Sequence, residues 1–200
     1  MVLDMNINLA GIDDEFLNEL DELIEETRVE YFIINPSTKE EIDKTQAICK
    51  EYERFKYTLP VQFTEQKDLN CMAIKIQQEN EIDLVKNIPL VIDSSDLNDS
   101  FITSLNNKDV VGIVLNSKES DSALVNFTYC ISHNSLKKWT KKALTDTDYN
   151  RLALQSDYPN FSYDELFDNL LKDMSDITFR AEQTIAAGGT RTILKMFGLM

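Results

Sequence analysis

Arg151-Leu152-Ala153-Leu154-Gln155-Ser156-Asp157-Tyr158-Pro159 is the segment that most constrains the architecture. Its alternating apolar residues, followed by a carboxylate just before a proline, predict a short buried strand that delivers Asp157 to the rim of a sheet. Barrels and doubly wound α/β folds carry their chemistry on the loops after the carboxyl ends of parallel strands. Asp157 is therefore a candidate site residue, although an aspartate at such a place is commonly a turn former or a helix cap.

Elsewhere in the chain, seven further segments have the composition and bounds of strands. They are residues 2–9, 31–34, 57–61, 71–76, 88–93, 110–115 and 125–131. Helical or loop segments separate them, and strands that alternate with helices form parallel sheets. The sequence therefore predicts an α/β fold, a TIM-type (β/α)8 barrel, and a shortened one, because about 250 residues is usual for this architecture.

The first strand has the clearest pattern. From Leu3 to Leu9 it alternates strictly, with apolar residues on one face and Asp4, Asn6 and Asn8 on the other. In a barrel the apolar face is expected to pack on the surrounding helices, which leaves the three polar residues pointing into the barrel toward a site. The alternative is an edge strand with one solvated face.

Helix signals fill the intervals between strands. Residues 12–26 place apolar side chains at helical spacing opposite an acidic face, and Ser37-Thr38-Lys39-Glu40 has the spacing of a capping box that opens a helix. A second capping box is expected at Ser162-Tyr163-Asp164-Glu165. Gly188-Gly189 is expected to break the last helical region, so that a final short helix starts at Thr190.

The amino-acid composition limits the domain organisation, the partners and the location that we expect. The chain has 200 residues, 42% of them hydrophobic, which predicts a single domain covering residues 1–200. Its net charge of −15 repels phosphate backbones and anionic membranes, so nucleic acid is an unexpected partner unless a metal ion assists. The three cysteines have no CxxC spacing, and no segment has the length of a membrane span. We therefore expect a cytoplasmic protein with free buried thiols and no membrane contact.

Several motifs, in matching order along nearly the whole chain, resemble the TatD family of metal-dependent hydrolases, (β/α)8 barrels that include deoxyribonucleases. The segment 154–159 resembles the Glu-Thr-Asp-x-Pro of that family, and residues 2–9 lie over its opening strand with Asp-x-His-x-His. Residues 88–96 resemble the strand ending in His-Ser-Arg-Asp, and residues 127–132 resemble Gly-Phe-Tyr-Ile-Ser. Residues 192–199 resemble the closing helix, which ends in Phe-Gly-Leu. The resemblance implies a metallo-dependent hydrolase-like barrel.

The same resemblance implies that most metal-ligand positions have changed. The vestigial site it implies consists of Asp4, Asn6, Asn8, Lys75, Asp93, Leu115 and Asp157. Asparagines stand for the two opening histidines, and a lysine stands near the place of a metal-bridging glutamate. Neutral amides are poor ligands for the divalent metals of such sites, so Asp93 and Asp157 are the only metal candidates, and weak ones. The one histidine of the chain, His133, matches none of the ligand positions.

Three functions are consistent with this pattern. The first is a catalytically degenerate TatD-like barrel, a pseudoenzyme that needs no cofactor and acts by binding a protein or a small ligand. The alternative is a divergent metal-dependent hydrolase, a deoxyribonuclease or phosphodiesterase, in which Asp4, Asp93 and Asp157 hold a divalent metal ion through oxygen ligands. The third is a scaffold whose acidic helices offer a surface to basic protein partners.

Overall fold

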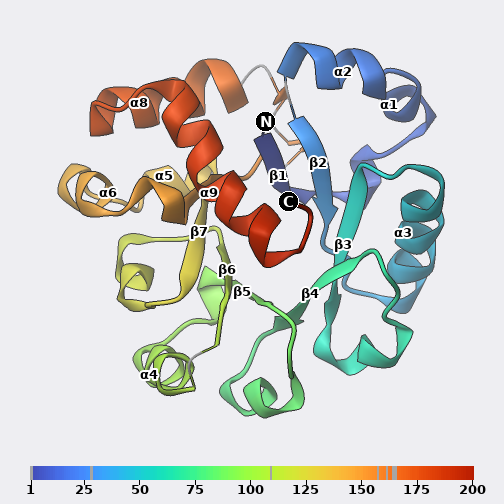
Figure 1. Cartoon of the computed structure of the whole chain (residues 1–200), viewed down its shortest axis with the longest axis horizontal. Coiled ribbons are helices and arrows are strands. Elements are labelled where there is room, and N and C mark those ends of the chain that lie inside the picture. The colour runs from blue at the N-terminus through green and yellow to red at the C-terminus, as the bar shows by residue number, and fades with distance from the viewer. Residues whose placement is uncertain (1, 28, 109, 157, 161, 164–165) are drawn as a thin grey trace.

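The computed structural model of the chain describes residues 2–27, 29–108, 110–156, 158–160, 162–163 and 166–200. Its centre is one sheet of eight parallel strands, hydrogen-bonded in sequence order and curled into a barrel with helices around it (Figure 1). The strands are β1 (Val2–Ile7), β2 (Val29–Ile34), β3 (Phe55–Pro60), β4 (Cys71–Ile76), β5 (Leu90–Asp93), β6 (Gly112–Leu115), β7 (Phe127–Ile131) and β8 (Leu152–Leu154). The predicted TIM-type barrel is confirmed.

The seam between β8 and β1 is closed mainly by a side chain. The backbone N–H of Ser156, just after β8, donates a hydrogen bond to Asp4 Oδ1 at 3.0 Å. Farther along, the N–H of Asn8 donates to the carbonyl of Tyr158 at 3.0 Å. A carboxylate therefore takes the place of a ladder carbonyl at the point where the barrel closes.

The barrel interior is filled by apolar side chains from every second strand position. They form one buried cluster of Leu3, Met5, Ile33, Ala73, Val91, Ile113, Leu115, Cys130 and Ala153, together with Ile193 and Leu194 of the last helix. The expected orientation of the first strand is therefore wrong for most of its length. Leu3 and Met5 point inward, whereas Asp4 points outward, and a register irregularity between Asp4 and Ile7 then moves Ile7 to the outer core.

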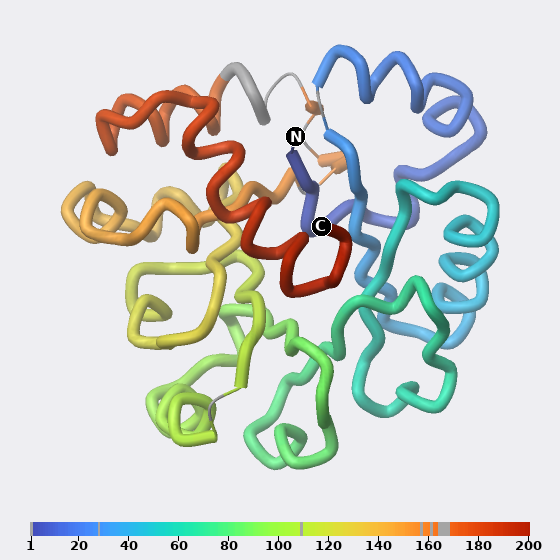
Figure 2. The backbone as a smooth tube through the Cα atoms, in the orientation of Figure 1, coloured from blue at the N-terminus to red at the C-terminus, as the bar shows by residue number. Residues whose placement is uncertain are grey.

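The last helix, α9 (Glu182–Met196), covers the amino-terminal end of the barrel. Its residues Ile193 and Leu194 join the interior cluster beside Leu3, and the chain ends over the barrel centre (Figure 2). The expected break at Gly188-Gly189 is wrong, because α9 runs through both glycines. Instead, the two glycines allow α9 to lie very close to the backbone of η6 and β8. A Cβ at Gly188 would lie 2.4 Å from the Tyr149 carbonyl oxygen, and one at Gly189 would lie 2.1 Å from that of Leu152.

The remaining segments form the outer layer. The helices are α1 (Asp14–Asn18), α2 (Leu20–Thr27), α3 (Lys39–Glu51), α4 (Asp99–Asn107), α5 (His133–Leu136), α6 (Lys141–Asp146) and α8 (Lys172–Thr178), with a π-helix η7 (Leu166–Leu171) before α8. Short 3-10 turns occupy η1 (Leu9–Gly11), η2 (Val61–Gln66), η3 (Glu79–Leu84), η4 (Ser94–Asp96), η5 (Glu119–Ala123) and η6 (Tyr149–Arg151). No helix within the described ranges combines the length and hydropathy that spanning a bilayer requires.

Two helix starts differ from the expectation by small shifts. The expected helix over residues 12–26 is divided into α1 and α2 at Glu19. The capping box of α3 is formed by Thr38 and Glu41 rather than by Ser37 and Glu40, although the Ser37 N–H also donates to Glu41. Of the second expected capping box, Asp164 and Glu165 lie outside the described residues.

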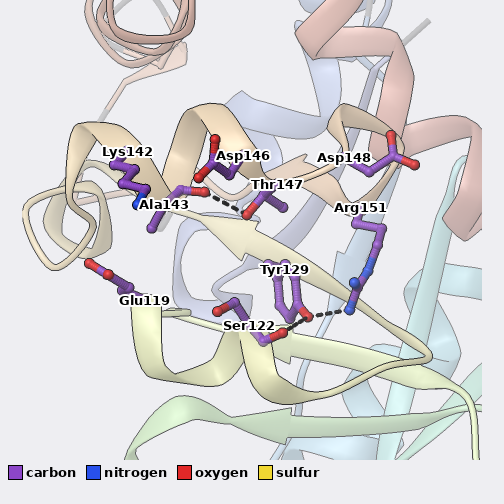
Figure 3. A pocket seen from close by; sticks show the side chains of 9 residues that line it. All are labelled: Glu119, Ser122, Tyr129, Lys142, Ala143, Asp146, Thr147, Asp148 and Arg151. Atoms are coloured by element: carbon purple, nitrogen blue, oxygen red, sulfur yellow. Dashed lines mark hydrogen bonds between the residues drawn. The ribbon is translucent and has the colours of Figure 1, made fainter.

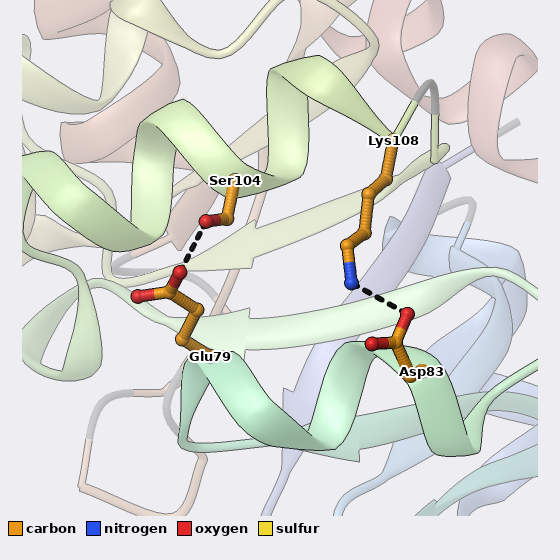
Figure 4. Close-up of polar contacts among 4 residues, drawn as sticks. All are labelled: Glu79, Asp83, Ser104 and Lys108. Atoms are coloured by element: carbon orange, nitrogen blue, oxygen red, sulfur yellow. Dashed lines mark hydrogen bonds and ion pairs between the residues drawn. The ribbon is translucent and has the colours of Figure 1, made fainter.

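Helix α4 packs beside η3 through polar contacts on the surface. Glu79 accepts hydrogen bonds from the hydroxyls of Ser104 and Ser100, and Lys108 pairs with Asp83 (Figure 4). The Asp83 side chain is 77% exposed. This pair therefore orients two surface elements without removing its charges from water.

Because exposed ion pairs contribute little, Asp83→Ala and Lys108→Ala should each lower the free energy of unfolding by less than about 1 kcal/mol. Their coupling in a double-mutant cycle, measured by urea unfolding, should be below about 0.5 kcal/mol and should fall when salt is added. A coupling above about 2 kcal/mol would mean that the pair is shielded from solvent.

Candidate functional site

At the carboxyl ends of the strands, the apolar interior gives way to polar side chains. On one side of this mouth they form a hydrogen-bonded row. The Asn35 amide, directly after β2, donates to Asn6 Oδ1 at 2.9 Å and to the Met5 carbonyl at 2.8 Å. Asn35 Oδ1 accepts from the Thr58 hydroxyl of β3 at 2.7 Å. Every polar atom of the Asn35 side chain thus has a partner in β1 or β3, which fixes the rim in this region.

The opposite side of the mouth carries a second amide network. Asn116 follows β6 and Gln155 follows β8, and the two bind reciprocally. Gln155 Nε2 donates to Asn116 Oδ1 at 2.9 Å, and the Asn116 backbone N–H donates to Gln155 Oε1 at 3.0 Å. Asn116 Nδ2 also donates to Asp93 Oδ2 at 2.9 Å. Asn116 has a φ of 52°, a left-handed conformation that asparagine tolerates better than most residues.

Asp93, at the end of β5, is an ionised group at this mouth. Its Oδ1 accepts from the N–H and the hydroxyl of Ser95, at 2.9 Å and 2.7 Å. Burial opposes its ionisation, but these bonds, the Asn116 amide and the ammonium of Lys75 outweigh it and hold the pKa of Asp93 below its ordinary value. Lys75, on β4, faces the same space and lines a small cavity of about 140 Å³ with Gln77 and Glu81. A fixed cation therefore balances the carboxylate.

Asp4 belongs to a separate site on the other face of β1. It is fully buried and accepts hydrogen bonds from the Ser156 N–H, the Ser156 hydroxyl and the Tyr163 hydroxyl, the last at 2.7 Å. Burial raises its pKa above the ordinary value in spite of these bonds. Its partners bind β1 to β8 and to the chain that follows β8. The predicted role of Asp4 in the barrel mouth is therefore wrong.

The structure accounts differently for the other predicted positions. Asn8 is exposed, and its side chain accepts from the Ala10 N–H at 2.9 Å to cap η1. Leu115 is buried in the interior cluster and pairs with Asp93 across β5 and β6. Asp157 lies outside the described residues. Of the seven predicted positions, Lys75 and Asp93 interact electrostatically and Leu115 pairs with Asp93, whereas Asn6 belongs to the Asn35 network at the end of β1.

Sequence analysis missed three residues of the mouth, namely Asn35, Asn116 and Gln155. Each is an amide placed immediately after a buried apolar strand. The rule that singled out Asp157, a polar residue at the carboxyl end of a strand, applies equally to them. These three amides have neither a charge nor an imidazole ring, so their residue type alone does not indicate metal chemistry.

The donor set of the mouth does not fit a catalytic divalent metal. Its described strand-end side chains are mainly amides, with a hydroxyl, the Lys75 ammonium and the Asp93 carboxylate, which already accepts three hydrogen bonds. Asp96 and Asp121 lie nearby, where burial and the charge of Asp93 raise their pKa values. In the described ranges, no three His, Cys, Asp or Glu side chains converge closely enough to hold an ion. His133 begins α5, capped by Ser132. A catalytic divalent metal ion needs several imidazole or carboxylate ligands.

The cysteines are structural. Cys49, Cys71 and Cys130 are all buried free thiols, as expected. Burial raises the pKa of the Cys49 and Cys71 thiols to about 12, so both are protonated at neutral pH. A protonated thiol is a weak nucleophile and a weak metal ligand.

A larger cavity of about 600 Å³ lies on the outer wall, beside the amino ends of β7 and β8 (Figure 3). Its wall includes Arg151, whose guanidinium lies 4.8 Å from the Tyr129 ring centre and donates to the carbonyls of Phe127 and Leu124. These contacts tie η6 to β7 and η5. Arg151 therefore has a structural role on the side of the barrel, away from the polar mouth.

No family model and no curated protein sequence matches the chain. Among solved structures, it is similar to the Escherichia coli TatD homologue YjjV, with a TM-score of 0.77 and 12% identity over 98% of each chain. It is also similar to a TatD family hydrolase of Entamoeba histolytica (TM-score 0.64, 11% identity, 98% of this chain and 97% of that one). It is similar as well to a 2,6-dihydroxybenzoate decarboxylase from Rhizobium (TM-score 0.61, 10% identity, 99% of this chain and 98% of that one). The chain therefore has the fold of the TatD-type barrel hydrolases.

Proposed function

We propose that this chain is a catalytically degenerate TatD-like barrel, which acts by binding and not by metal-dependent hydrolysis. The observation that carries the proposal is the amide network of the mouth. Asn6 and Asn35 bind each other on one side, and Asp93, Asn116 and Gln155 on the other. Each of the four amide oxygens already accepts a hydrogen bond within the protein, and a metal ion at the mouth would gain mainly neutral, weak ligands.

The positive charge of Lys75 is a second argument for the proposal. Its ammonium lowers the pKa of Asp93, so a positive charge already lies near the carboxylate that a divalent ion would need. A metal ion at this place would be repelled by the lysine ammonium. The lysine thus makes the surroundings of Asp93 less favourable for a divalent cation.

The carboxylate-only hydrolase is the weaker proposal. It requires Asp4 and Asp93 to share one ion with Asp157. Asp4 is engaged by Ser156 and Tyr163 on the outer side of β1, whereas Asp93 is engaged by Ser95 and Asn116 at the mouth. Two carboxylates held in separate networks cannot both ligate one ion without breaking the closure of the barrel.

The proposal is tested by metal binding and by nuclease activity. Isothermal titration with Mg²⁺, Mn²⁺ or Zn²⁺ should detect no site tighter than about 1 mM, a dissociation constant that corresponds to about 4 kcal/mol of binding free energy. With the same ions, hydrolysis of single- and double-stranded DNA should equal that of an Asp93→Asn control. One equivalent of tightly bound metal, or DNA hydrolysis lost in Asp93→Asn, would show a working metallohydrolase.

A further inference from the structure

A second cavity, on the side of the molecule formed by α1 and α2, has acidic walls and an aromatic floor. Its volume is about 450 Å³, within the range of ligand-sized clefts, about 300–1,000 Å³. The lining side chains are Asp13, Glu15, Phe16, Glu19, Leu23, Glu26, Thr27, Tyr158, Ser162 and Tyr163. This cavity shares no lining residue with the polar mouth, so binding at the cavity is independent of the function proposed for the mouth.

The aromatic floor is rigid. The Tyr158 ring is stacked on Tyr163, with ring centres 5.3 Å apart, and it contacts the tilted Phe16 ring, with ring centres 5.1 Å apart. It also lies close against Gly11, where a Cβ would come within 2.8 Å of the Tyr158 ring. Phe16 and Tyr163 are buried, whereas Tyr158 is half-buried. The floor therefore offers part of one fixed aromatic ring to the cavity.

The acidic walls have no compensating cation among the residues that the structure describes. Residues 1–27 contain nine Asp and Glu and no Lys or Arg, and Arg28, which follows them, lies outside the described residues. Asp13 caps α1 through the Phe16 N–H, while Glu15, Glu19 and Glu26 are exposed or half-buried and form no ion pair with any lysine or arginine in the described part of the chain. Burial raises the pKa of Tyr158, and the nearby charges of Asp13, Glu15 and Glu19 raise it further.

These charges partly favour and partly oppose the helices that carry them, because Glu15 and Glu22 lie in the first turns of α1 and α2, where the helix dipole favours a negative charge. Glu15 and Glu19, and likewise Glu22 and Glu26, are four residues apart, a spacing at which like charges repel. Glu26 lies in the last turn of α2, which contains no basic residue and where the helix dipole disfavours a negative charge. A cation bound among these carboxylates would relieve the repulsion.

We propose that this cavity receives the guanidinium of an arginine from a basic segment of a partner protein. A planar guanidinium stacks on an aromatic face and donates several hydrogen bonds to carboxylates, so it matches both the floor and the walls. A lysine would satisfy the charge but could not stack in the same way. Nucleic acids and anionic membranes are repelled by the same walls.

The test uses fluorescence anisotropy with a labelled peptide of alternating glycine and arginine, at about 0.15 M salt so that long-range attraction is screened. We expect the full-length protein to bind this peptide at least about tenfold more tightly than a matched peptide with neutral citrulline for arginine. Substitution of Glu15→Gln together with Glu19→Gln should weaken binding about tenfold, and Tyr158→Leu about fivefold.

The matched control is Asp43→Asn together with Glu51→Gln, which removes two exposed charges from α3. It changes the net charge equally and should alter affinity less than about twofold. Thermal unfolding of each variant checks that it is folded. If the double variant in α3 weakened peptide binding as much as the double variant in the cavity, binding would depend on net charge alone. The proposal would be overturned if Tyr158→Leu bound the arginine peptide as tightly as the wild type, or if the wild type bound the citrulline peptide as tightly as the arginine peptide.

Discussion

Asp4→Ala should lower the free energy of unfolding by about 3 kcal/mol, because it leaves buried donors without an acceptor. The Asp4 carboxylate accepts from the N–H and hydroxyl of Ser156, the Tyr163 hydroxyl and the Asn6 N–H. Alanine removes all four acceptor contacts at the seam where β8 meets β1. Removing a buried charge recovers part of its desolvation cost, which is why the expected loss is not larger.

Urea unfolding followed by circular dichroism measures this loss, with Asp4→Asn as the matched variant. The asparagine retains an oxygen for the Ser156 N–H, and its amide can donate to the Ser156 and Tyr163 hydroxyls, which can turn to accept. Asp4→Asn should therefore cost less than about half as much as Asp4→Ala. If Asp4→Ala unfolded at the same urea concentration as the wild type, the seam would not depend on this carboxylate.

The stability difference between the wild type and Asp4→Asn should also change with pH. Because burial raises the folded-state pKa of Asp4 above 3.8, its contribution is fully present below pH 3.8 and is lost as pH rises through the folded pKa. The wild type should thus lose stability relative to the asparagine variant between acidic and neutral pH. The comparison largely cancels the repulsion from the net charge of −15, which both proteins share apart from one unit. A difference independent of pH would mean that Asp4 has an ordinary pKa.

The strands and the barrel could be predicted from the sequence because hydrophobic patterning is local. Each strand is a short apolar run, and the helices between them impose parallel pairing. The orientation of β1 could not be predicted, because both faces of a barrel strand are buried and alternation alone does not show which face points into the barrel. Asp4 lies among the outer residues, where Ser156 and Tyr163, both far along the chain, supply hydrogen bonds to it.

The sequence indicated only some of the polar residues at the carboxyl ends of the strands. Lys75 and Asp93 lie there, while Asn8 caps a turn. The reciprocal pair of Asn116 and Gln155 joins two positions separated by an entire β/α unit. No local pattern relates two such amides, since the hydrogen bond exists only after the barrel has closed.

Gly189→Ala should lower the free energy of unfolding by about 3 kcal/mol, although intrinsic helix propensity predicts the opposite sign. In the middle of an exposed helix, alanine is favoured over glycine by about 1 kcal/mol. Gly189 is instead buried in α9, and an added Cβ would lie 2.1 Å from the Leu152 carbonyl oxygen and 2.7 Å from the Ala153 backbone nitrogen. Both atoms belong to β8, so the clash can be relieved only by moving α9 away from the barrel, which opens the packing that covers its amino end.

The control for this prediction is Gln183→Ala, at an exposed position of the same helix, which should change the free energy of unfolding by less than about 0.5 kcal/mol. Urea unfolding of the two variants is compared with that of the wild type. In Gly189→Ala, a gain in helix propensity would raise the free energy of unfolding, whereas a clash between α9 and β8 would lower it. Gly188→Ala should be destabilising as well, since its Cβ would meet the Tyr149 carbonyl. A Gly189→Ala protein more stable than the wild type would show that α9 does not press against β8, and the paired glycines would then be a helix defect without a packing purpose.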